Sequence, residues 1–504
     1  MRLVREGALA LCVVVAAAAC SDRTAYQCSS AEQCVLNGQP GTCEPQGFCS
    51  FPDATCPNGQ RFEPHAGDGL GGQCAATPPV DAPPPIDAPP PPCGTVGLAC
   101  CANEIQQPCA TGLACTSGTC EACVQEVGLG KRFACFVKRD HTVWCSGDNE
   151  AGQLGNGVTS VTPTATPVQV KDATGPITDA TDVETTMFSA CAIRAGGAVW
   201  CWGRGTSGAL GNGAVTNQSL AVRVVTAGAV PLDNIVELAG GWNHVCARDG
   251  NLGVWCWGRD SSNQLGDGLT TQRNVAGAVL DAPGGAPLTG ALKLVSGGDH
   301  ACVLKANDEI WCWGANSSGQ FGDTTTANHG SPVKIATSRS VAGGSYYTCW
   351  VNADTSVSCT GANYHGTLGI GTGGSFSGAN ELAPKSVVTA LGGPPFLGAV
   401  EVAAGSAMAC ARTQDGHVWC WGDNNYGQTG TGAGNAVPGQ VLTRVGTSIV
   451  PLTNVDRLTA HFPHVCAHTT DLGWMCWGRN RDGELGDGSF INPTFATPLS
   501  LTCP

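Results

Sequence analysis

Charged residues and long apolar runs are both scarce in this chain of 504 residues. Asp, Glu, Lys and Arg together make up 13% of it, whereas there are 71 glycines and 31 prolines. This composition fits many tight turns and short strands, and it argues against extensive helix. The apolar run from Ala8 to Ala19 has twelve residues, which is too few to span a bilayer.

Familiar catalytic motifs are also missing. The sequence has no H-E-x-x-H, no G-x-S-x-G and no G-x-x-x-x-G-K-[ST]. The glycine cluster at 369–378 resembles a nucleotide-binding loop only in composition, because no helical pattern follows it. We therefore expect no enzyme activity, no catalytic residue, no cofactor and no metal site. The net charge of −14 disfavours binding to nucleic acid, because an acidic surface repels phosphates.

Three histidines are the remaining candidates for chemistry. His461, His464 and His468 form H-x-x-H-x-x-x-H, a conceivable metal site. However, His464 lies two residues before a cysteine, as do His244 and His300, and this recurrence favours a structural role. Acidic turns elsewhere lack the ligand density of a calcium loop.

The dominant feature is a stretch that occurs seven times between residues 130 and 490. Its best example, 244–268, has a cysteine, nine residues, a second cysteine flanked by tryptophans, and then G-x-[ND]-x-x-G-Q-L-G-[ND]-G. Successive second cysteines are separated by 56, 55, 56, 47, 61 and 56 residues. The variation in repeat length therefore lies in the segments that connect the repeats. Repeats of this length indicate a radial array. The cysteine pairs are Cys135 with Cys145, Cys191 with Cys201, Cys246 with Cys256, Cys302 with Cys312, Cys349 with Cys359, Cys410 with Cys420, and Cys466 with Cys476.

The motif W-G-x-N-x-x-G-Q-L-G resembles the repeat of the regulator of chromosome condensation family. Good matches start at Trp257, Trp313 and Trp421. The resemblance implies an all-β, seven-bladed β-propeller. Two copies have Ser146 and Thr360 in place of tryptophan, and two have Ala209 and Thr367 in place of glutamine.

Each repeat should contain a β-hairpin closed by a disulfide. In 191–201, a turn around Gly196 sets Cys191 opposite Cys201. Directly opposite residues are close enough for a disulfide, and the C-x9-C spacing is not that of a zinc site. Strand alternation then puts Trp200 and Trp202 on one face and Val199 and Cys201 on the other. Both faces should be buried between blades.

The N-terminal 123 residues indicate a tethered, exported region. We expect a signal peptide over 1–19 and lipidation of Cys20, as in bacterial lipoproteins; simple secretion is the alternative. Cystine-rich modules follow at 20–76 and 93–123, separated by a proline-rich linker at 77–92, and the propeller covers 124–504. Thirty cysteines indicate an oxidising compartment, the cell envelope or outer membrane. Disulfide connectivity within 28–74 and 93–120 stays open.

Two cysteines remain after all others are assigned, Cys123 and Cys503. We expect a disulfide between them, because a propeller can be closed by its two chain ends. On this hypothesis the strand at 497–501 lies beside residues 124–127 and completes a blade.

For function, the sequence favours a monomeric scaffold that binds an unknown protein or glycan and touches the membrane only through its lipid. The family's nuclear roles do not fit an exported acidic chain; secreted bacterial propellers such as β-lactamase inhibitory proteins are closer in setting. We expect the working surface in connectors such as 214–233, 269–290 and 369–398, and Phe376 and Phe396 could form a binding loop. Shortening 372–396 should leave stability unchanged. A lyase or glycan-cleaving enzyme, or an enzyme inhibitor, is the alternative. Carboxylates and histidine at one mouth of the disc would favour an enzyme, and an aromatic face would favour binding.

Overall fold

The computed structural model describes residues 119–373, 378–432, 435–499 and 501, with short strands at 35–36, 39–40, 42–43, 49–52, 60–62 and 113–116. The chain divides into two compact units, Met1–Pro91 and Pro92–Pro504. The first contains the pair β1 (Val35–Leu36) and β2 (Gln39–Pro40), and the three-stranded sheet β3 (Thr42–Cys43), β4 (Cys49–Pro52) and β5 (Gln60–Phe62). The expected signal peptide, Cys20 and the proline-rich linker lie outside the described residues, so those assignments stay predictions.

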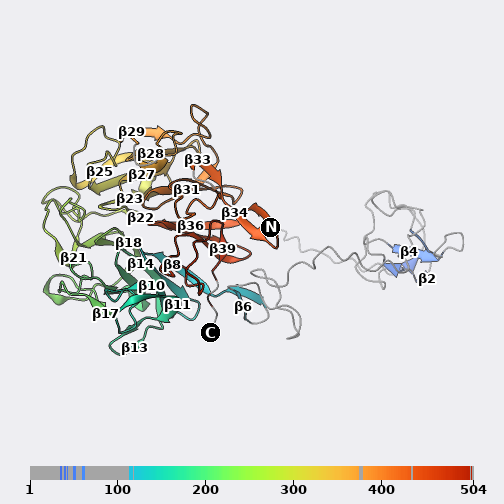
Figure 1. Cartoon of the computed structure of the whole chain (residues 1–504), viewed down its shortest axis with the longest axis horizontal. Coiled ribbons are helices and arrows are strands. Elements are labelled where there is room, and N and C mark those ends of the chain that lie inside the picture. Colours follow the sequence, from blue (N-terminus) through green and yellow to red (C-terminus); the bar gives the residue numbers. More distant parts are fainter. Residues whose placement is uncertain are drawn as a thin grey trace, which may run out of the picture. The chain divides into compact units, whose positions relative to one another are not determined.

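The second unit is a seven-bladed β-propeller, as the repeat predicts (Figure 1). Each blade is a four-stranded antiparallel meander made from one continuous stretch of chain. The first strands, which line a central channel, are β8 (Val124–Leu129), β14 (Ala180–Thr185), β18 (Ile235–Gly240), β22 (Ala291–Ser296), β26 (Val341–Gly343), β30 (Ala399–Ala404) and β36 (Val455–His461). The second strands are β9 (Phe133–Lys138), β15 (Ser189–Arg194), β19 (His244–Asp249), β23 (His300–Lys305), β27 (Tyr347–Val351), β31 (Met408–Thr413) and β37 (His464–Thr469).

The third and fourth strands complete the blades outwards. The third strands are β10 (Val143–Asn149), β16 (Ala198–Gly203), β20 (Val254–Gly258), β24 (Glu309–Gly314), β28 (Val357–Gly361), β32 (Val418–Gly422) and β38 (Gly473–Gly478). The fourth strands are β11 (Ser160–Gln169), β17 (Gln218–Arg223), β21 (Arg273–Ala278), β25 (His329–Thr337), β29 (Glu381–Ser386), β33 (Asn435–Gln440) and β39 (Thr497–Pro498). Further hairpins are β6 (Leu113–Thr116) with β7 (Thr119–Ala122), β12 (Lys171–Asp172) with β13 (Gly175–Pro176), and β34 (Leu442–Val445) with β35 (Ser448–Pro451).

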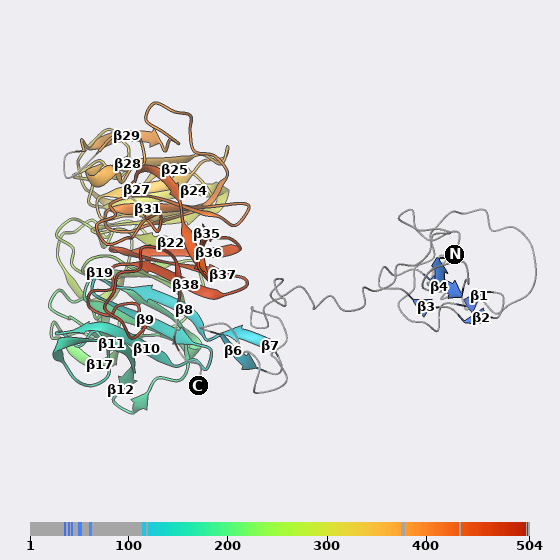
Figure 2. The same ribbon diagram turned by 45° about the vertical axis from the view of Figure 1, so that its right-hand side comes forward.

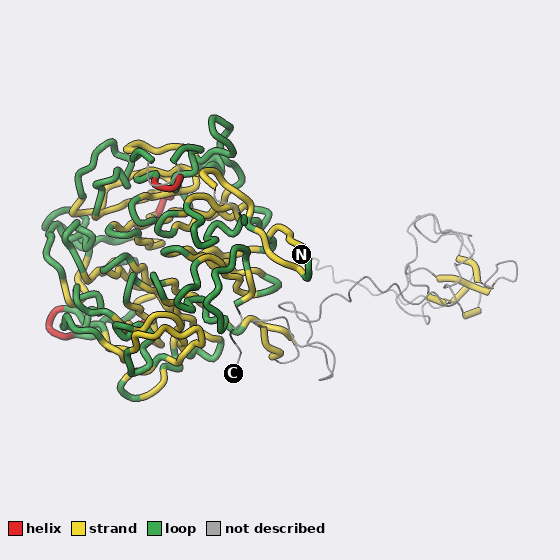
Figure 3. The backbone as a smooth tube through the Cα atoms, in the orientation of Figure 1, coloured by secondary structure: helices red, strands yellow, loops and turns green. Residues whose placement is uncertain are grey.

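Strands dominate the described chain (Figure 3). Its helical elements are four three-residue 3-10 turns: η2 (Ala195–Gly197), η3 (Ala227–Ala229), η4 (Ala306–Asp308) and η5 (Tyr364–Gly366). Within the described ranges, the search for a helix of sufficient length and apolarity to cross a membrane finds none.

Antiparallel order gives the disc two distinct faces (Figure 2). The upper face carries the loops from first to second strands, such as 130–132 and 241–243, and the G-Q-L-G turns from third to fourth strands. The lower face carries the hairpin turns from second to third strands, such as 139–142, and the connectors between blades, such as 170–179. Each face therefore carries one short, regular turn and one longer, more variable connection from every blade.

The hairpin register matches the sequence prediction. Cys191 lies opposite Cys201, Ala192 opposite Trp200 and Ile193 opposite Val199. The same register recurs in every blade, where the cysteine of the second strand faces the cysteine of the third strand directly.

All seven predicted in-blade disulfides are present, with Cα atoms 4.0–4.1 Å apart, and all fourteen cysteines are buried. In chain order the bridges join Cys135 and Cys145, Cys191 and Cys201, Cys246 and Cys256, Cys302 and Cys312, Cys349 and Cys359, Cys410 and Cys420, and Cys466 and Cys476. The zinc alternative is thereby removed for these cysteines, because each sulfur is already bonded within its own hairpin.

The two faces of each blade pack as expected from strand alternation. Trp202 packs on the cystine face of blade 1, beside Cys135 and Cys145. The opposite side of the same sheet presents Cys191 and Cys201 to blade 3. Burial of both faces between blades is the main apolar contribution to stability.

A ring of hydrogen bonds ties each blade to the one before it. The second tryptophan of W-C-W-G is fully buried, and its indole N–H donates to the carbonyl of the residue at the glutamine position of the preceding blade. These bonds are Trp202 to Gln153 at 2.8 Å, Trp257 to Ala209 at 2.9 Å, Trp313 to Gln264 at 3.0 Å, Trp421 to Thr367 at 2.9 Å and Trp477 to Gln428 at 3.0 Å. The glycine below has no room for a side chain: a Cβ on Gly266 would lie 2.8 Å from Cδ1 of Trp313.

The two repeats without this tryptophan use a hydroxyl to bond the preceding blade: Ser146 bonds at its glutamine position and Thr360 one residue before that position. Thr360 Oγ1 donates to the Gly319 carbonyl at 2.8 Å, and Ser146 Oγ donates to the Glu484 carbonyl at 3.0 Å. The second of these bonds closes the ring between blades 7 and 1, so the departures from the motif preserve its role in packing.

The expected closure by the C-terminal strand is wrong. β39 pairs with β38 inside blade 7, not with β8. Each blade already has four strands of its own, so no strand has to be supplied by the other end of the chain. Instead the seam is closed by face-to-face packing, in which Leu499 and Leu501 join Val124 and Trp474 in one buried cluster.

The long connectors are also not simple loops. The segments 214–233, 269–290 and 369–398 contain β17, β21 and β29, the fourth strands of blades 2, 3 and 5. Each of these segments runs from the upper to the lower face of the disc. They therefore do not form a common binding surface on one face. The prediction that 372–396 can be removed without loss of stability is therefore wrong, because it includes β29 and the fully buried Val387.

Candidate functional site: the upper mouth of the channel

The upper mouth of the channel holds a depression of about 400 Å³. Loops from six of the seven blades line it, so no single repeat could form it alone. The side chains that shape it include Lys131, Met187, Trp242, Tyr426, Phe462 and Arg479. We call it the mouth depression.

Glycines close the floor of this depression. Gly297, Gly298, Gly343, Gly344 and Gly405 surround a void of about 10 Å³, the space of one water molecule. The first side chain of the next strand folds over the glycine: a Cβ on Gly297 would lie 2.2 Å from Cε1 of His300. The mouth is thus closed tightly from below, and its walls are aromatic or charged.

Aromatic rings at the mouth are held by specific contacts. Trp242 and Tyr346 meet edge to face, with ring centroids 4.9 Å apart. The Phe188 ring lies under the Arg204 guanidinium at 3.8 Å and the Lys131 ammonium at 5.6 Å. Such contacts hold an aromatic–cationic surface in a fixed conformation before any partner arrives.

Tyr426 forms a second cluster of an aromatic ring with cationic groups, on the other side of the mouth. The guanidinium groups of Arg481 and Arg479 lie 5.1 and 5.8 Å from its ring centroid. Arg479 is also tied to acidic side chains, whereas Arg481 is exposed.

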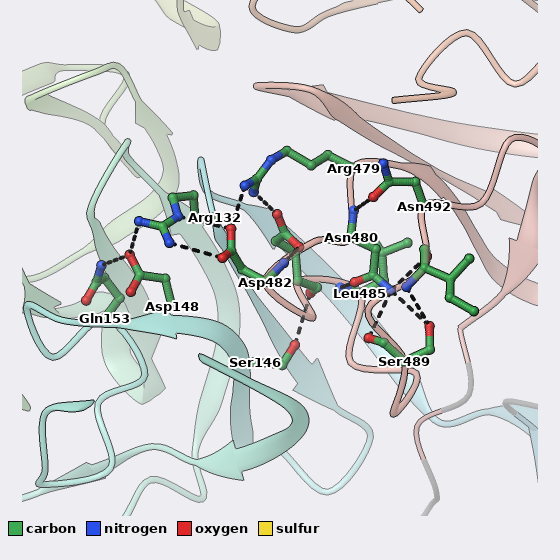
Figure 4. Close-up of polar contacts among 12 residues, drawn as sticks. Arg132, Ser146, Asp148, Gln153, Arg479, Asn480, Asp482, Leu485, Ser489 and Asn492 are labelled. Atoms are coloured by element: carbon green, nitrogen blue, oxygen red, sulfur yellow. Dashed lines mark hydrogen bonds and ion pairs between the residues drawn. The ribbon is translucent and has the colours of Figure 1, made fainter. Parts of the chain in front are cut away.

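A charge network holds the mouth together where blades 7 and 1 meet (Figure 4). Arg132 donates from Nε and Nη2 to both oxygens of Asp482, at 3.0 Å each, and Arg479 Nη2 donates to Asp482 at 2.6 Å. Arg479 also pairs with Glu484. Burial opposes ionisation of Asp482, but the hydrogen bonds from Arg132 and Arg479 hold its pKa below the usual value. These residues serve the closure of the disc.

The channel below is lined with carboxylates towards its lower end. Burial raises the pKa of Glu184 to about 8, helped by repulsion from Asp182. Burial and the nearby Glu126 raise the pKa of Asp182 to about 6. Other acids there are neutralised, since Arg248 pairs with Glu237 at 2.7 Å and Arg412 with Glu401 at 2.8 Å. The channel cavity has a volume of about 230 Å³.

The repeated histidines lie in the packed interior. His244, His300 and His464 are fully buried at the start of their second strands, and burial lowers their pKa values to about 3, 4 and 3. His461 lies at the channel, whereas His468 bonds Asp456 at 2.6 Å. Among the residues that the structure describes, no three His, Cys, Asp or Glu side chains gather where a metal ion could bind.

Phe396 and Cys123 lie away from the mouth. Phe396 is only 5% exposed and packs on Trp419, so the expectation that it forms a binding loop is wrong. Phe376 lies outside the described residues. Cys123 is disulfide-bonded, but Cys503 falls beyond the described chain, so their pairing stays a prediction.

Sequence reasoning missed the mouth residues because it sought function in long connectors. Lys131, Met187, Trp242 and Phe462 occupy one repeat position, two residues before the start of the second strand. That position and the one after it change from copy to copy, whereas the cysteines of the hairpin that follows do not. Residue variation at this loop position, next to a hairpin pattern that is constant in all repeats, could have predicted the mouth residues.

These features define the class: a β-propeller of seven disulfide-stapled repeats with an aromatic–cationic channel mouth. Two family models described as regulator of chromosome condensation (RCC1) repeat match the sequence, one at 124–153, 292–320 and 399–428, the other at 196–248 and 307–351. The chain therefore contains regulator of chromosome condensation repeats at these residues.

Known proteins with the same repeats are distant. The E3 ubiquitin-protein ligase HERC2 of Homo sapiens is 25% identical over 355 residues, which are 69% of this chain and 7% of that protein. Human WBSCR16 has a TM-score of 0.56 and 17% identity, covering 74% of this chain and 94% of that one. Prp20p of Saccharomyces cerevisiae, described with its binding properties to Gsp1p and histones, has a TM-score of 0.51 and 20% identity, covering 67% and 80%. At these identities the structural likeness shows the fold alone.

Proposed function

We propose that this protein is an exported, lipid-anchored, non-enzymatic scaffold that binds a protein partner through the upper face of its propeller. The mouth depression carries the proposal. It combines Trp242, Tyr426 and Arg479, the residue types that dominate binding energy at protein interfaces, in a concave site held by contacts from neighbouring blades. Prp20p, which has this fold, is a protein studied for its binding to other proteins.

The direction of the tether supports use of the upper face. The chain enters the disc at Cys123, whose carbonyl accepts the N–H of Arg139 in a lower-face turn at 3.0 Å. It leaves near Leu499, whose N–H donates to the Trp474 carbonyl at the lower end of β38. Both connections of the described propeller chain therefore lie on its lower face, and neither covers the upper face.

An enzyme is the second candidate, and the raised pKa of Glu184 favours it. A carboxyl that stays protonated near neutral pH can serve as a general acid. However, the channel cavity of about 230 Å³ is smaller than ordinary ligand pockets of roughly 300–1,000 Å³, and the glycine floor separates it from the upper mouth. The aromatic mouth therefore supports binding more strongly than the channel supports catalysis.

Capture from envelope extract tests the proposal. The mature protein, a Trp242→Ala variant and a Leu292→Ala variant are immobilised at equal density. Leu292 is 49% exposed at the lower end of the channel and serves as the matched control. The proposal expects one partner to be lost with Trp242→Ala and kept with Leu292→Ala. Equal capture by all three forms would contradict it, and cleavage of an envelope polymer that is lost with Glu184→Gln would favour the enzyme.

A further inference from the structure

The seven repeats provide an internal comparison across the upper face. Among the described residues, blades 7, 1, 2 and 3 differ from blades 4, 5 and 6 in two respects: the cations around the mouth, and the outer rim formed by the residues just after each G-Q-L-G-[ND]-G turn. Since the backbone frame repeats, side chains confined to one sector are not needed to form a blade.

The first difference is in unpaired cations. Lys131, Arg204, Arg259 and Arg481 belong to blades 1, 2, 3 and 7, and within the described chain none of them forms an ion pair with a carboxylate. By contrast, Arg132 and Arg479 of the upper face both pair with Asp482, and the lower-face Arg194 pairs with Asp179. In blades 4, 5 and 6 the position of Arg204 and Arg259 is taken by Ala315, Ala362 and Asp423. Within the sector, blade 1 has the buried Asp148 there and blade 7 has the ion-paired Arg479, so the cations of these two blades, Lys131 and Arg481, come from neighbouring loop positions.

The second difference is in the outer rim. Exposed apolar side chains occur there in the same four blades: Val158 is 57% exposed, Val215 46%, Leu269 59% and Ile491 74%. At the rims of blades 4, 5 and 6, the described residues include no large apolar side chain with comparable exposure. In these four blades, cations around the channel mouth and apolar side chains at the outer rim of the disc thus occupy one sector of the upper face.

We propose that this sector, blades 7, 1, 2 and 3 of the upper face, binds a folded protein through a loop that carries both acidic and apolar side chains. The inference rests on the proposed function and names the kind of partner. Acidic groups of the partner would pair with these four cations, while its apolar side chains would cover the rim. Complementary charge sets orientation and association rate, and buried apolar area adds affinity.

A protein fits this sector better than a long polyanion. The mouth also carries Asp299, whose pKa is raised by burial against the opposing effect of the nearby Arg259, and Asp423; blade 1 carries the exposed Glu150, and the whole chain has a net charge of −14. Four cations next to such charges suit one short acidic segment, whereas nucleic acid or an anionic glycan would meet repulsion beyond the sector.

Selection from a phage library of short random loops on a folded carrier tests the inference with the full mature protein. Loops selected on the wild type should be enriched in Asp or Glu next to aromatic or aliphatic residues. A double reversal, Arg204→Glu with Arg259→Glu, should weaken their binding at least about tenfold. The control, Lys171→Glu with Lys293→Glu, changes the net charge equally at exposed lower-face positions and should leave binding unchanged.

Selected loops without acidic residues, or equal weakening by both double variants, would overturn the inference. If such loops still lost binding with Trp242→Ala, the proposed function would stand and only the partner's chemistry would be wrong. If the selected loops bound the Trp242→Ala variant as tightly as the wild type, the proposed function itself would be contradicted. Competition by heparin or duplex DNA for the same site would overturn the assignment to a protein.

Discussion

Replacing Trp313 by phenylalanine should cost far more stability than the same change at Trp311, two residues away on β24. Trp313 is fully buried and donates its indole N–H to the Gln264 carbonyl at 3.0 Å. The phenylalanine variant leaves that carbonyl unpaired, which costs about 1–3 kcal/mol, and the smaller ring loses packing worth about 1 kcal/mol more. We expect a loss of about 2–4 kcal/mol.

Trp311 is the matched control. It is partly exposed, and its indole N–H bonds the Glu309 carboxylate at 3.1 Å, where water can replace it. Its loss should cost less than about 1 kcal/mol. Guanidinium unfolding of the oxidised proteins, followed by far-ultraviolet circular dichroism, measures both. Equal losses for the two variants would refute the assignment of inter-blade hydrogen bonds to the inner tryptophan.

Further predictions concern the seam, titration and the anchor. Ser146→Ala should lower the unfolding free energy by about 1–2 kcal/mol, whereas Ser146→Thr keeps a hydroxyl and should lose less; the same denaturation series checks this. Because the folded pKa of Glu184 is raised to about 8, ionisation opposes folding and wild-type stability falls as pH rises through that value. Glu184→Gln should therefore gain about 2 kcal/mol over wild type at pH 9, after allowance for solvent screening of a partly exposed group, and nothing at pH 4; thermal melts at both pH values decide it. His464 is buried uncharged with a pKa lowered to about 3, so its contribution is complete above pH 6.5 and is lost as pH falls towards 3. His464→Leu should therefore lose less stability than the wild type as pH falls towards 3. An equal loss in both proteins would count against burial of the neutral His464 as the cause of the acid destabilisation. Finally, detergent partition should retain the wild type in the detergent phase and release Cys20→Ala.

The sequence predicts the frame of this fold well because the repeat is strongly patterned. The C-x9-C hairpin, its register and the two-sided burial of each sheet follow from strand alternation around Cys191 and Cys201. The roles of Ser146 and Thr360 could not be predicted, because the sequence shows only that the tryptophan is missing and not that a hydroxyl bonds the preceding blade in its place.

Features that depend on contacts between distant blades were either predicted wrongly or could not be predicted from the sequence. The position of the C-terminal strand required knowing whether each blade is already complete, which local pattern does not reveal. The mouth gathers Lys131, Trp242 and Tyr426 from three blades that are far apart in sequence. The channel carboxylates Asp182 and Glu184 lie on one strand, but their raised pKa values come from burial by the closed ring.

The claim that the upper face holds the partner can be tested inside the cell. A photo-crosslinking amino acid is placed at Trp242, on the upper mouth, and in a separate protein at Leu292, on the lower end of the channel. After irradiation of intact cells and purification of the tethered protein, mass spectrometry identifies the crosslinked chains. We predict one dominant protein adduct from position 242 and none from position 292. Adducts formed only from position 292, or an equal mixture from both, would contradict the account.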